Sequence, residues 1–377
     1  MKLKIYLDII LKEYKQKYFY IVVYILNISH IEKRYKYILT VLYINMKRKI
    51  IKQGHSTLTV TLPSEWVKKL NIRAGDELDV FEEAGSLIVH GKQNEYNKKT
   101  TIDITGFSVP MLWRFFQSAY REGYDEIKLV YNSNKKSYEG AYNYYASQFE
   151  YKRMGEEPSE KPALNMIQEL VDRFIGIAII DHGEGYCTIK EMGELTSKEF
   201  DNSLRRIFLL IIELFDKIID LIKHNKTGDI SVCKTIHTMD INIDRFIDYC
   251  CRINNKIKDS SFQKNKPIMF STLFLLELLG DEFKYIGNHL AKSKKKVDEI
   301  AEFAETVKEH FEMYYHLFYK FDRDMAIKFG KNDFKIYNNH FKWKESSNKD
   351  VQSIRGHLMQ ISKFVFCLME LRIEMEY

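Results

Sequence analysis

The chain lacks most of the sequence features by which enzymes are recognised. It contains no G-x-G-x-x-G or Walker motif, which excludes phosphate-cradling loops of those kinds. No Asp or Glu is followed three residues later by His, so the Glu-x-x-His signature of di-iron bundles is absent. No arrangement of Ser, His and Asp, or of Cys and His, indicates a catalytic nucleophile. We therefore expect no enzymatic activity.

Cysteine is scarce, and its spacing is uninformative about metal or disulfides. The five cysteines are odd in number and include no C-x-x-C pair, which is typical of reduced thiols in a cytoplasmic protein. We expect the adjacent Cys250 and Cys251 to serve helix packing. The full set is Cys187, Cys233, Cys250, Cys251 and Cys367.

Apolar runs long enough to cross a bilayer, about 20 residues, are also missing. Runs such as Tyr18 to Ile28 and Tyr37 to Ile44 are too short, and no small-residue cleavage site follows them. We expect neither an integral membrane segment nor a signal peptide. We expect translation to start at Met46, which makes residues 1–45 an upstream extension. The alternative is a real amphipathic helical extension.

Net charge is +6 over 377 residues, but it is concentrated near the N-terminus. The first 45 residues carry eight Lys or Arg against three acids, so the remaining 332 residues are close to +1. Any field that attracts nucleic acid must therefore be local. The length and the 45% hydrophobic content predict two or three domains with real cores.

Residues 46–92 have the pattern of a small β module. Three apolar residues alternate with threonines from Thr57 to Leu62, which predicts a strand. Ser64 is expected to cap a helix of one or two turns. Residues 77–81 and 86–89 then predict a hairpin. A unit of this size cannot bury a sufficient core alone.

The first half of this module is unusually basic. Between Lys47 and Arg73, seven Lys or Arg residues stand against one acid. Clustered cations gain affinity for DNA by displacing counterions from its phosphates. The DNA-binding residues that we predict are Lys47, Arg48, Lys49, Lys52 and Arg73.

The module resembles the swapped-hairpin DNA-binding domain of the AbrB/SpoVT family, in which two chains interleave their strands and present basic loops to DNA. The matching features are Gly54, Ser56, Thr59 to Pro63, the helix SEWVKKLNI, Gly75-Asp76-Glu77 and the closing hairpin. The resemblance implies a homodimer that binds DNA. The alternatives are a dimerisation cap and an antitoxin-like module that binds another protein.

Residues 99–193 predict a small α/β domain around an open sheet. The segment 132–162, rich in Tyr, Asn, Lys and Glu, is expected to be an inserted loop. Strands are expected over residues 101–105, 126–130, 176–180 and 186–190, and helices over residues 110–122 and 163–174.

From residue 195 to 377 the pattern is nearly all helical. Apolar residues recur at alternating four- and three-residue steps from Phe200 to Leu221, which is typical of a bundle seam. Long helices with short polar joints predict an antiparallel bundle. Further helices are expected over residues 230–257, 267–292, 297–329 and 351–376, with a poorer one over 333–344.

Two acidic pairs border the apolar stripes of this bundle. Asp240 and Asp244 lie on one helix, and Glu277 and Asp281 share a face of the next. A carboxylate among apolar residues is costly unless it is paired, protonated or bound to metal. If the two helices pack antiparallel, four oxygen donors converge, which suits Mg²⁺, Mn²⁺, Ca²⁺ or iron.

An ion pair with Lys284 or Arg245, or a solvated edge, is the alternative to this metal site. Spacing alone favours that alternative.

The long helices, the D-x-x-x-D spacing and the segment ELLGDEFKYIGNHL resemble the PhoU family of phosphate-uptake regulators, whose three-helix repeats bind metal through E/D-x-x-x-D pairs. An AbrB-like module before such a bundle is similar to archaeal PhoU-type proteins, over residues 46–377. The final helix departs from the pattern and offers only Glu370 and Glu374, so we expect at most one metal site per chain. The residues that the resemblance assigns to metal are Asp240, Asp244, Glu277 and Asp281.

The resulting expectation is a multidomain protein: a swapped-hairpin β module, a small α/β middle domain and a C-terminal all-α PhoU-like bundle. Its expected function is that of a cytoplasmic DNA-binding regulator of phosphate uptake, with the bundle as sensor or partner-binding domain. Expected partners are DNA, a second copy of the chain and a phosphate transporter or its signalling proteins. The alternative is an interaction protein that regulates such a transporter, binds no DNA and oligomerises through the β module. A carboxylate-bridged metalloenzyme is the third class, and the missing Glu-x-x-His signature argues against it.

Overall fold

The computed structural model divides the chain into two units, Met1–Asn94 and Glu95–Tyr377, and we describe each by itself. The expected extension, Lys47, Ser56 and residues 133–136 and 139–160 of the expected loop lie outside the described residues. The described ranges are 48–54, 57–83, 86–90, 98–132, 137–138, 161–193, 195–257, 265–343 and 346–377.

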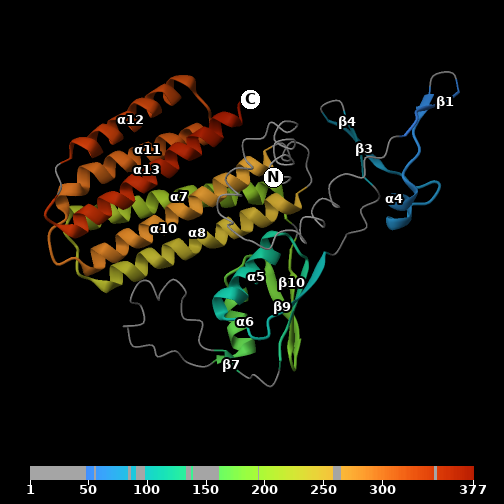
Figure 1. The fold of residues 1–377 in the computed structure, drawn as a ribbon, viewed down its shortest axis with the longest axis horizontal. Helices are drawn as coiled ribbons and strands as arrows, with labels where there is room; N and C mark the ends of the chain where they lie inside the picture. Colours follow the sequence, from blue (N-terminus) through green and yellow to red (C-terminus); the bar gives the residue numbers. More distant parts are fainter. Residues whose placement is uncertain are drawn as a thin grey trace, which may run out of the picture. The chain divides into compact units, whose positions relative to one another are not determined.

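The first unit contains the β module that the sequence predicts (Figure 1). β1 pairs with β2 and β3 pairs with β4, both antiparallel. The strand expected over residues 57–62 is confirmed as the shorter β2, and its partner β1 was not expected. The short helix and the hairpin are confirmed, with the first hairpin strand two residues later than expected. The elements are β1 (Ile51–Gln53), β2 (Thr57–Thr59), α4 (Ser64–Lys69), β3 (Asp79–Glu83) and β4 (Ser86–His90).

The expected cap of α4 is wrong. Pro63, not Ser64, occupies the N-cap position, and no side chain there accepts a hydrogen bond from the first turn. Ser64 is already helical. The ring of proline fixes its φ, here −63°, so the chain enters the helix in a set direction without a capping side chain.

Six large apolar side chains of the β module are exposed. No residue whose burial the structure describes between positions 48 and 90 is fully buried. So many exposed large apolar side chains in one small module are unusual for a module that stands alone. The exposed fractions are 69% for Ile50, 52% for Ile51, 66% for Leu58, 57% for Val60, 56% for Val80 and 72% for Leu87.

The second unit begins with a mixed sheet of strand order β5-β6-β10-β9. β5 (Lys99–Asp103) runs parallel to β6 (Glu126–Val130), because the helix α5 (Val109–Arg121) carries the chain back between them. β10 (Tyr186–Glu191) pairs antiparallel with β6 and forms a hairpin with β9 (Ile177–Gly183). The predicted α/β order is confirmed, with every boundary within three residues.

Helices α5 and α6 (Ala163–Val171) lie together on one face of this sheet (Figure 1). The ring of Phe174 lies 5.2 Å from that of Phe116 and 4.7 Å from that of Tyr120. The Tyr120 hydroxyl donates a 2.7 Å hydrogen bond to the carbonyl of Ile175. These contacts fix α5 against the chain that follows α6. The expected inserted loop is bounded by the antiparallel pair β7 (Ser137–Tyr138) and β8 (Lys161–Pro162).

The rest of the second unit is a bundle of long helices that lie side by side (Figure 1). The apolar seam predicted from Phe200 to Leu221 is buried throughout. Thr196 and Glu199 form a capping box at the start of this helix, which satisfies two of its free backbone N–H groups. The helices are α7 (Ser197–Lys223), α8 (Ile230–Lys256), α10 (Lys266–Lys292), α11 (Ala301–Tyr319), α12 (Arg323–Lys342) and α13 (Lys349–Glu374).

The helix expected over residues 297–329 is wrong. A short 3₁₀ turn precedes α11, which ends at Tyr319, and a separate helix α12 begins at Arg323. The carboxylate of Asp322 accepts a 2.7 Å hydrogen bond from the backbone N–H of Met325 and so caps α12. The poorer helix expected over 333–344 is the second half of α12.

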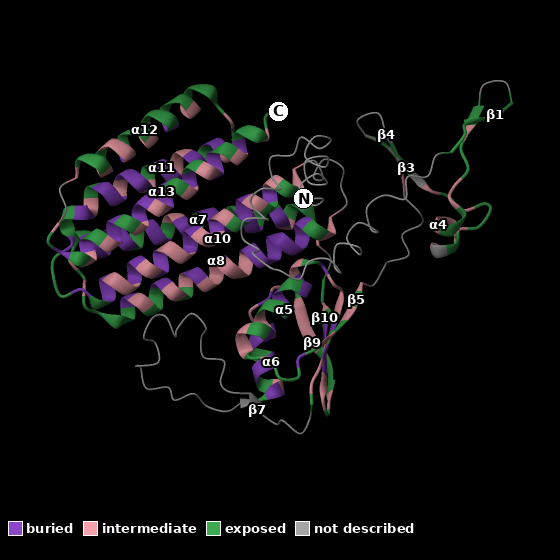
Figure 2. Ribbon diagram, in the orientation of Figure 1, coloured by how far each residue is buried: buried purple, intermediate pink, exposed green. Residues whose placement is uncertain are grey.

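α12 is the least buried of the long helices (Figure 2). Only Phe329 and Ile336 among its residues are buried, whereas α7 buries thirteen. None of the described helices is long and apolar enough to span a membrane.

Candidate functional site

The predicted DNA-binding cations occupy two places in the β module. Arg48 and Lys49 precede β1, Lys52 lies within it, and all three are exposed. Arg73 is also exposed and lies in the turn after α4, where its backbone N–H donates a 2.8 Å hydrogen bond to Asp76. The structure therefore groups three cations on one strand and its approach, with Arg73 in a separate turn.

Two glycines bring α8 and α10 close together at the predicted metal site. A Cβ added to Gly280 would lie 2.8 Å from Oδ1 of Asp240, and one added to Gly287 would lie 2.7 Å from Cδ1 of Ile236. The glycines are seven residues apart, so they share one face of α10. Larger side chains at these positions would separate the helices and the polar groups between them.

The carboxylates at this contact surround the ammonium group of Lys284. Its Nζ lies 2.9 Å from Oδ2 of Asp240 and 2.5 Å from Oδ1 of Asp281. Asp240 is 1% exposed and Lys284 is 6% exposed. Burial lowers the pKa of Lys284, but the nearby carboxylates outweigh that effect and raise it above its usual value. Lys284 is therefore a charged part of this contact.

Asp244 lies one helical turn after Asp240. Burial and the charge of Asp240 raise the pKa of Asp244 well above its usual value, and Lys284 opposes them. Arg173, which follows α6, interacts with Asp244 and stacks on Trp113 at 4.7 Å. The α/β part of the chain thus supplies a cation to the carboxylates of the bundle.

A second cation from the α/β part, Arg121 at the end of α5, joins both bundle helices. Its Nε lies 2.5 Å from the carboxylate of Asp248 on α8, and its guanidinium lies 3.0 Å from that of Glu277 on α10. Gln117 adds a 3.0 Å hydrogen bond to Asp248. Burial raises the pKa of Asp248 to about 6, although Arg121 acts in the opposite direction.

The four residues predicted as metal ligands are thus brought together, but with cations of the protein among them. Lys284 pairs with Asp240 and Asp281, and Arg121 pairs with Glu277. Within the described ranges, no three His, Cys, Asp or Glu side chains are grouped so that they could hold a metal ion. The geometry is that of the ion-pair alternative through Lys284. A metal here stays a prediction, and it requires Lys284 to move away.

Sequence reasoning missed Arg121, Asp248 and the second layer of ion pairs beside them. Arg252, 1% exposed on α8, donates hydrogen bonds to the carbonyl of Tyr120 at 2.7 Å and to the carboxylate of Glu191 at 2.9 Å. The paired residues are 61 to 156 positions apart in the sequence, so no short sequence motif could have predicted them. Together the two layers form a polar seam between the α/β part and the bundle.

Comparison with known proteins finds one family to which the β module is similar. Residues 51–97 match the model of the family described as antidote-toxin recognition MazE, bacterial antitoxin. The match covers the β module alone. No curated protein and no solved structure matches the chain.

Proposed function

We propose that the chain is a DNA-binding transcription regulator of phosphate uptake that pairs with a second copy through its β module. The observation that carries this proposal is the MazE-type module, whose described residues expose both a row of apolar side chains and a group of cations. An exposed apolar strand and a hairpin form a sufficient core when a second copy adds its own. The cations then lie on a rigid double module.

Three of the cations are close enough to one another in the sequence to contact neighbouring phosphates of one DNA strand. Arg48, Lys49 and Lys52 lie within five residues of each other, and β1 pairs with β2 through three residue pairs. Lys52 lies on β1, whose pairing with β2 fixes its place, and Arg48 and Lys49 come just before that strand. Each contact that neutralises a phosphate releases a counterion, which makes binding strongly dependent on salt.

The bundle is the proposed sensor or partner-binding part. Its assignment to phosphate uptake rests on the resemblance of its helices and acidic pairs to the PhoU family.

The test is DNA binding by the full chain and by a variant in which the five cations are replaced by Ala. We expect the parent to bind the DNA upstream of its own gene more tightly than a scrambled duplex. Each lost phosphate contact should reduce the log-log salt slope by about 0.9. The replaced residues are Lys47, Arg48, Lys49, Lys52 and Arg73.

The matched control removes five exposed lysines from the bundle, which changes the net charge equally. This control should bind DNA like the parent. If the five-cation variant also binds like the parent, DNA recognition by the β module is disproved. The control residues are Lys198, Lys217, Lys234, Lys349 and Lys363.

A second candidate function is that of an interaction protein whose β module only joins it to a protein partner. The exposed apolar residues of the module favour this candidate, since they fit a protein surface as well as a second copy. Equal affinity for native and scrambled DNA, with no salt dependence, would support it.

A further inference from the structure

The outward face of α12 carries a row of large apolar side chains. Ile327, Phe334 and Phe341 are 50%, 69% and 77% exposed. They are seven residues apart, which places them two turns apart on one line, about 21 Å long in total. The buried residues of α12, Phe329 and Ile336, lie on its opposite side. This row therefore contributes nothing to the bundle core.

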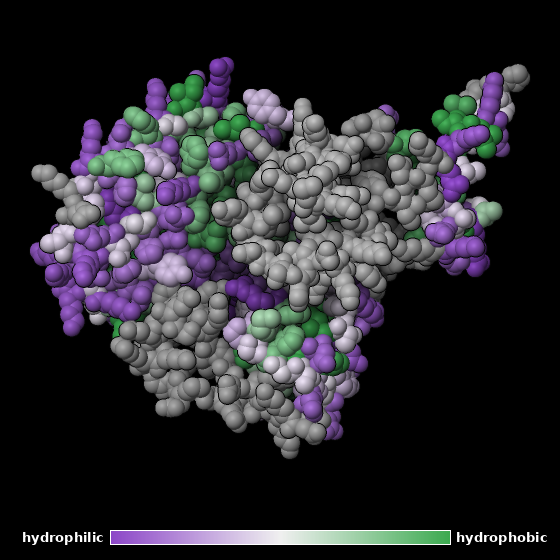
Figure 3. Space-filling view, in the orientation of Figure 1, coloured by the Kyte–Doolittle hydropathy of each residue, from purple (hydrophilic) through white to green (hydrophobic). Residues whose placement is uncertain are grey.

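A flank of lysines runs beside this row. Lys328, Lys331, Lys335 and Lys342 are exposed, and none forms an ion pair with a carboxylate of the described residues. Of the acids of this helix, Asp333 faces His310 on the bundle side, and the exposed Asp324 lies in the first turn, before Ile327. The space-filling view shows hydrophilic and hydrophobic side chains mixed over this side of the bundle (Figure 3).

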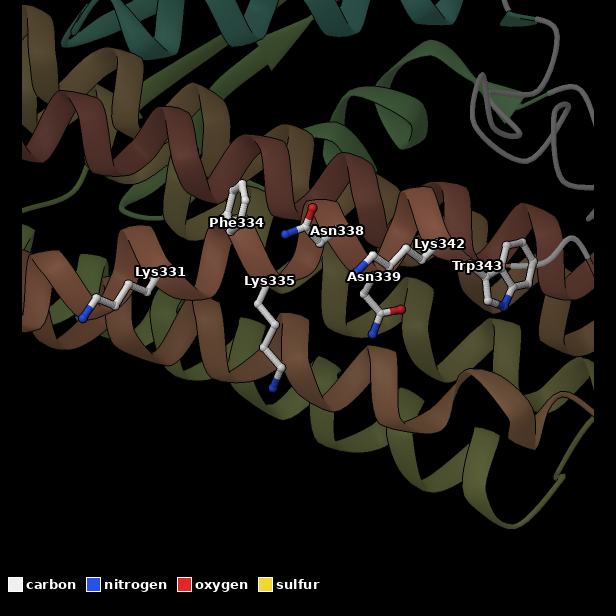
Figure 4. A pocket seen from close by; sticks show the side chains of 7 residues that line it. All are labelled: Lys331, Phe334, Lys335, Asn338, Asn339, Lys342 and Trp343. Atoms are coloured by element: carbon white, nitrogen blue, oxygen red, sulfur yellow. The ribbon is translucent and has the colours of Figure 1, made fainter.

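The flank borders a hollow of about 640 Å³. Its lining offers ammonium groups and side-chain amides beside two aromatic rings, and it comes from α12 and the residue after it (Figure 4). Because a single helix lines it, the hollow is open and shallow. The lining residues are Lys331, Phe334, Lys335, Asn338, Asn339, Lys342 and Trp343.

We propose that this face of α12 binds the surface of a membrane that contains anionic phospholipid. The three apolar side chains insert at the boundary between head groups and acyl chains, and the lysines meet the phosphates of the head groups. Lys331, Lys335 and Lys342, which line the hollow at successive points along α12, each meet the phosphate of a different head group. The proposal is independent of DNA binding by the β module.

Charge and shape favour a membrane over other occupants. In a second copy packed antiparallel on this row, the lysine flanks of the two helices would face each other and repel. DNA would leave the three apolar side chains without an apolar surface to pack against. A bound helix of another protein fits a groove, whereas this face is an exposed helix with a shallow hollow. A flat anionic surface suits both the row and the flank.

The first arm of the test is sedimentation of the full chain with vesicles. The parent should bind vesicles of phosphatidylcholine and phosphatidylglycerol in equal parts, should not bind phosphatidylcholine alone, and should dissociate in high salt. Replacing Lys331, Lys335 and Lys342 by Gln should weaken binding by roughly 100-fold, since each lysine near an anionic surface contributes about fivefold. The control with Lys198, Lys217 and Lys234 replaced by Gln has the same net charge and should bind like the parent.

The second arm tests the apolar row. Phe334→Ser with Phe341→Ser should weaken vesicle binding by at least about tenfold, because each buried ring contributes through its apolar area. Phe274→Ser with Leu209→Ser, which removes side chains 49% and 42% exposed elsewhere on the bundle, should not. Circular dichroism checks that each variant is folded.

Three outcomes would overturn the proposal. The first is binding of vesicles by the lysine variant as tightly as by its charge-matched control. The second is equal binding to phosphatidylcholine alone. The third is a loss of self-association, seen as a lower molecular mass in solution, when Phe334 and Phe341 are replaced and vesicle binding stays unchanged. That result would assign the face to contact with a second copy.

Discussion

His310 shows how a single buried residue makes stability depend on pH. It is fully buried on α11 and stacks on Phe329 with ring centroids 4.0 Å apart. Its Nε2 lies 3.6 Å from the carboxylate of Asp333, beyond hydrogen-bond distance. Burial lowers its pKa to about 3. The folded chain therefore holds this imidazole neutral, while the unfolded chain protonates it near its usual pKa of about 6.5.

The sign of the effect follows from this difference. Below about pH 6.5, His310 binds a proton in the unfolded state but not in the folded state. The free energy of unfolding therefore falls as the pH falls, by about 1.4 kcal/mol per pH unit, until the pH reaches about 3. His310→Phe should remove this contribution. Chemical denaturation of parent and variant across that range measures it.

A control keeps the comparison specific. His224→Phe changes a mostly exposed histidine that follows α7, and it should leave the pH dependence close to that of the parent. If parent and His310→Phe lose stability in parallel on acidification, the buried neutral histidine is not the cause.

At the scale of the helix, the contact between α8 and α10 depends on Gly280. Its missing Cβ leaves room for Oδ1 of Asp240, a buried carboxylate held by Lys284. We expect Gly280→Ala to lower the free energy of unfolding by about 1–3 kcal/mol, since the added methyl group displaces a paired charge in a tight contact. Thermal and urea unfolding measure the change.

Gly330 on α12 is the matched control, because a Cβ added there meets nothing within 4 Å. Gly330→Ala should be neutral or stabilising by up to about 1 kcal/mol, through its better helix propensity. Equal effects of the two substitutions would mean that α8 and α10 are not closely packed at Gly280.

The apolar periodicity of the sequence correctly predicted the helices that bury many side chains, such as α7. The seam of α7 and the strand β6 lie where the pattern places them. The break between α11 and α12 was missed because residues 320–322 contain neither Gly nor Pro, and only the capping carboxylate of Asp322 marks it. Apolar periodicity continues across the break, so it predicted one helix instead of two.

Only part of the candidate site could be predicted, because helix spacing shows which residues share a helix face and does not show contacts between distant segments. Spacing along a helix placed Asp240 beside Asp244 and Glu277 beside Asp281, and the structure brings the two pairs together. It could not reveal Arg121, which reaches Asp248 across 127 residues and Glu277 across 156. Long-range ion pairs depend on the tertiary fold, and one sequence carries no local trace of them.

At the scale of the whole molecule, the two units should separate in function. Residues 95–377 contain the sheet, the bundle and the seam that joins them, with a buried core of their own. This shortened chain should fold cooperatively and be monomeric, because the exposed apolar residues of the β module are gone. Light scattering of the full and shortened chains measures the masses.

The matched comparison is the full chain with Val80→Ser and Leu87→Ser, which removes two exposed apolar side chains from the hairpin. This variant should lose the dimer as well. A shortened chain that remains a dimer would place the contact between copies outside the β module.

Because α12 buries only two side chains, its backbone hydrogen bonds should also open more often than those of the other long helices. A helix that buries two side chains opens locally at a small fraction of the free energy needed to unfold the whole unit. Its amide hydrogens should therefore exchange with deuterated solvent well before those of α7, whose thirteen buried side chains tie its opening to global unfolding. We therefore expect α12 to sample open states on its own, while α7 opens only when the whole unit unfolds.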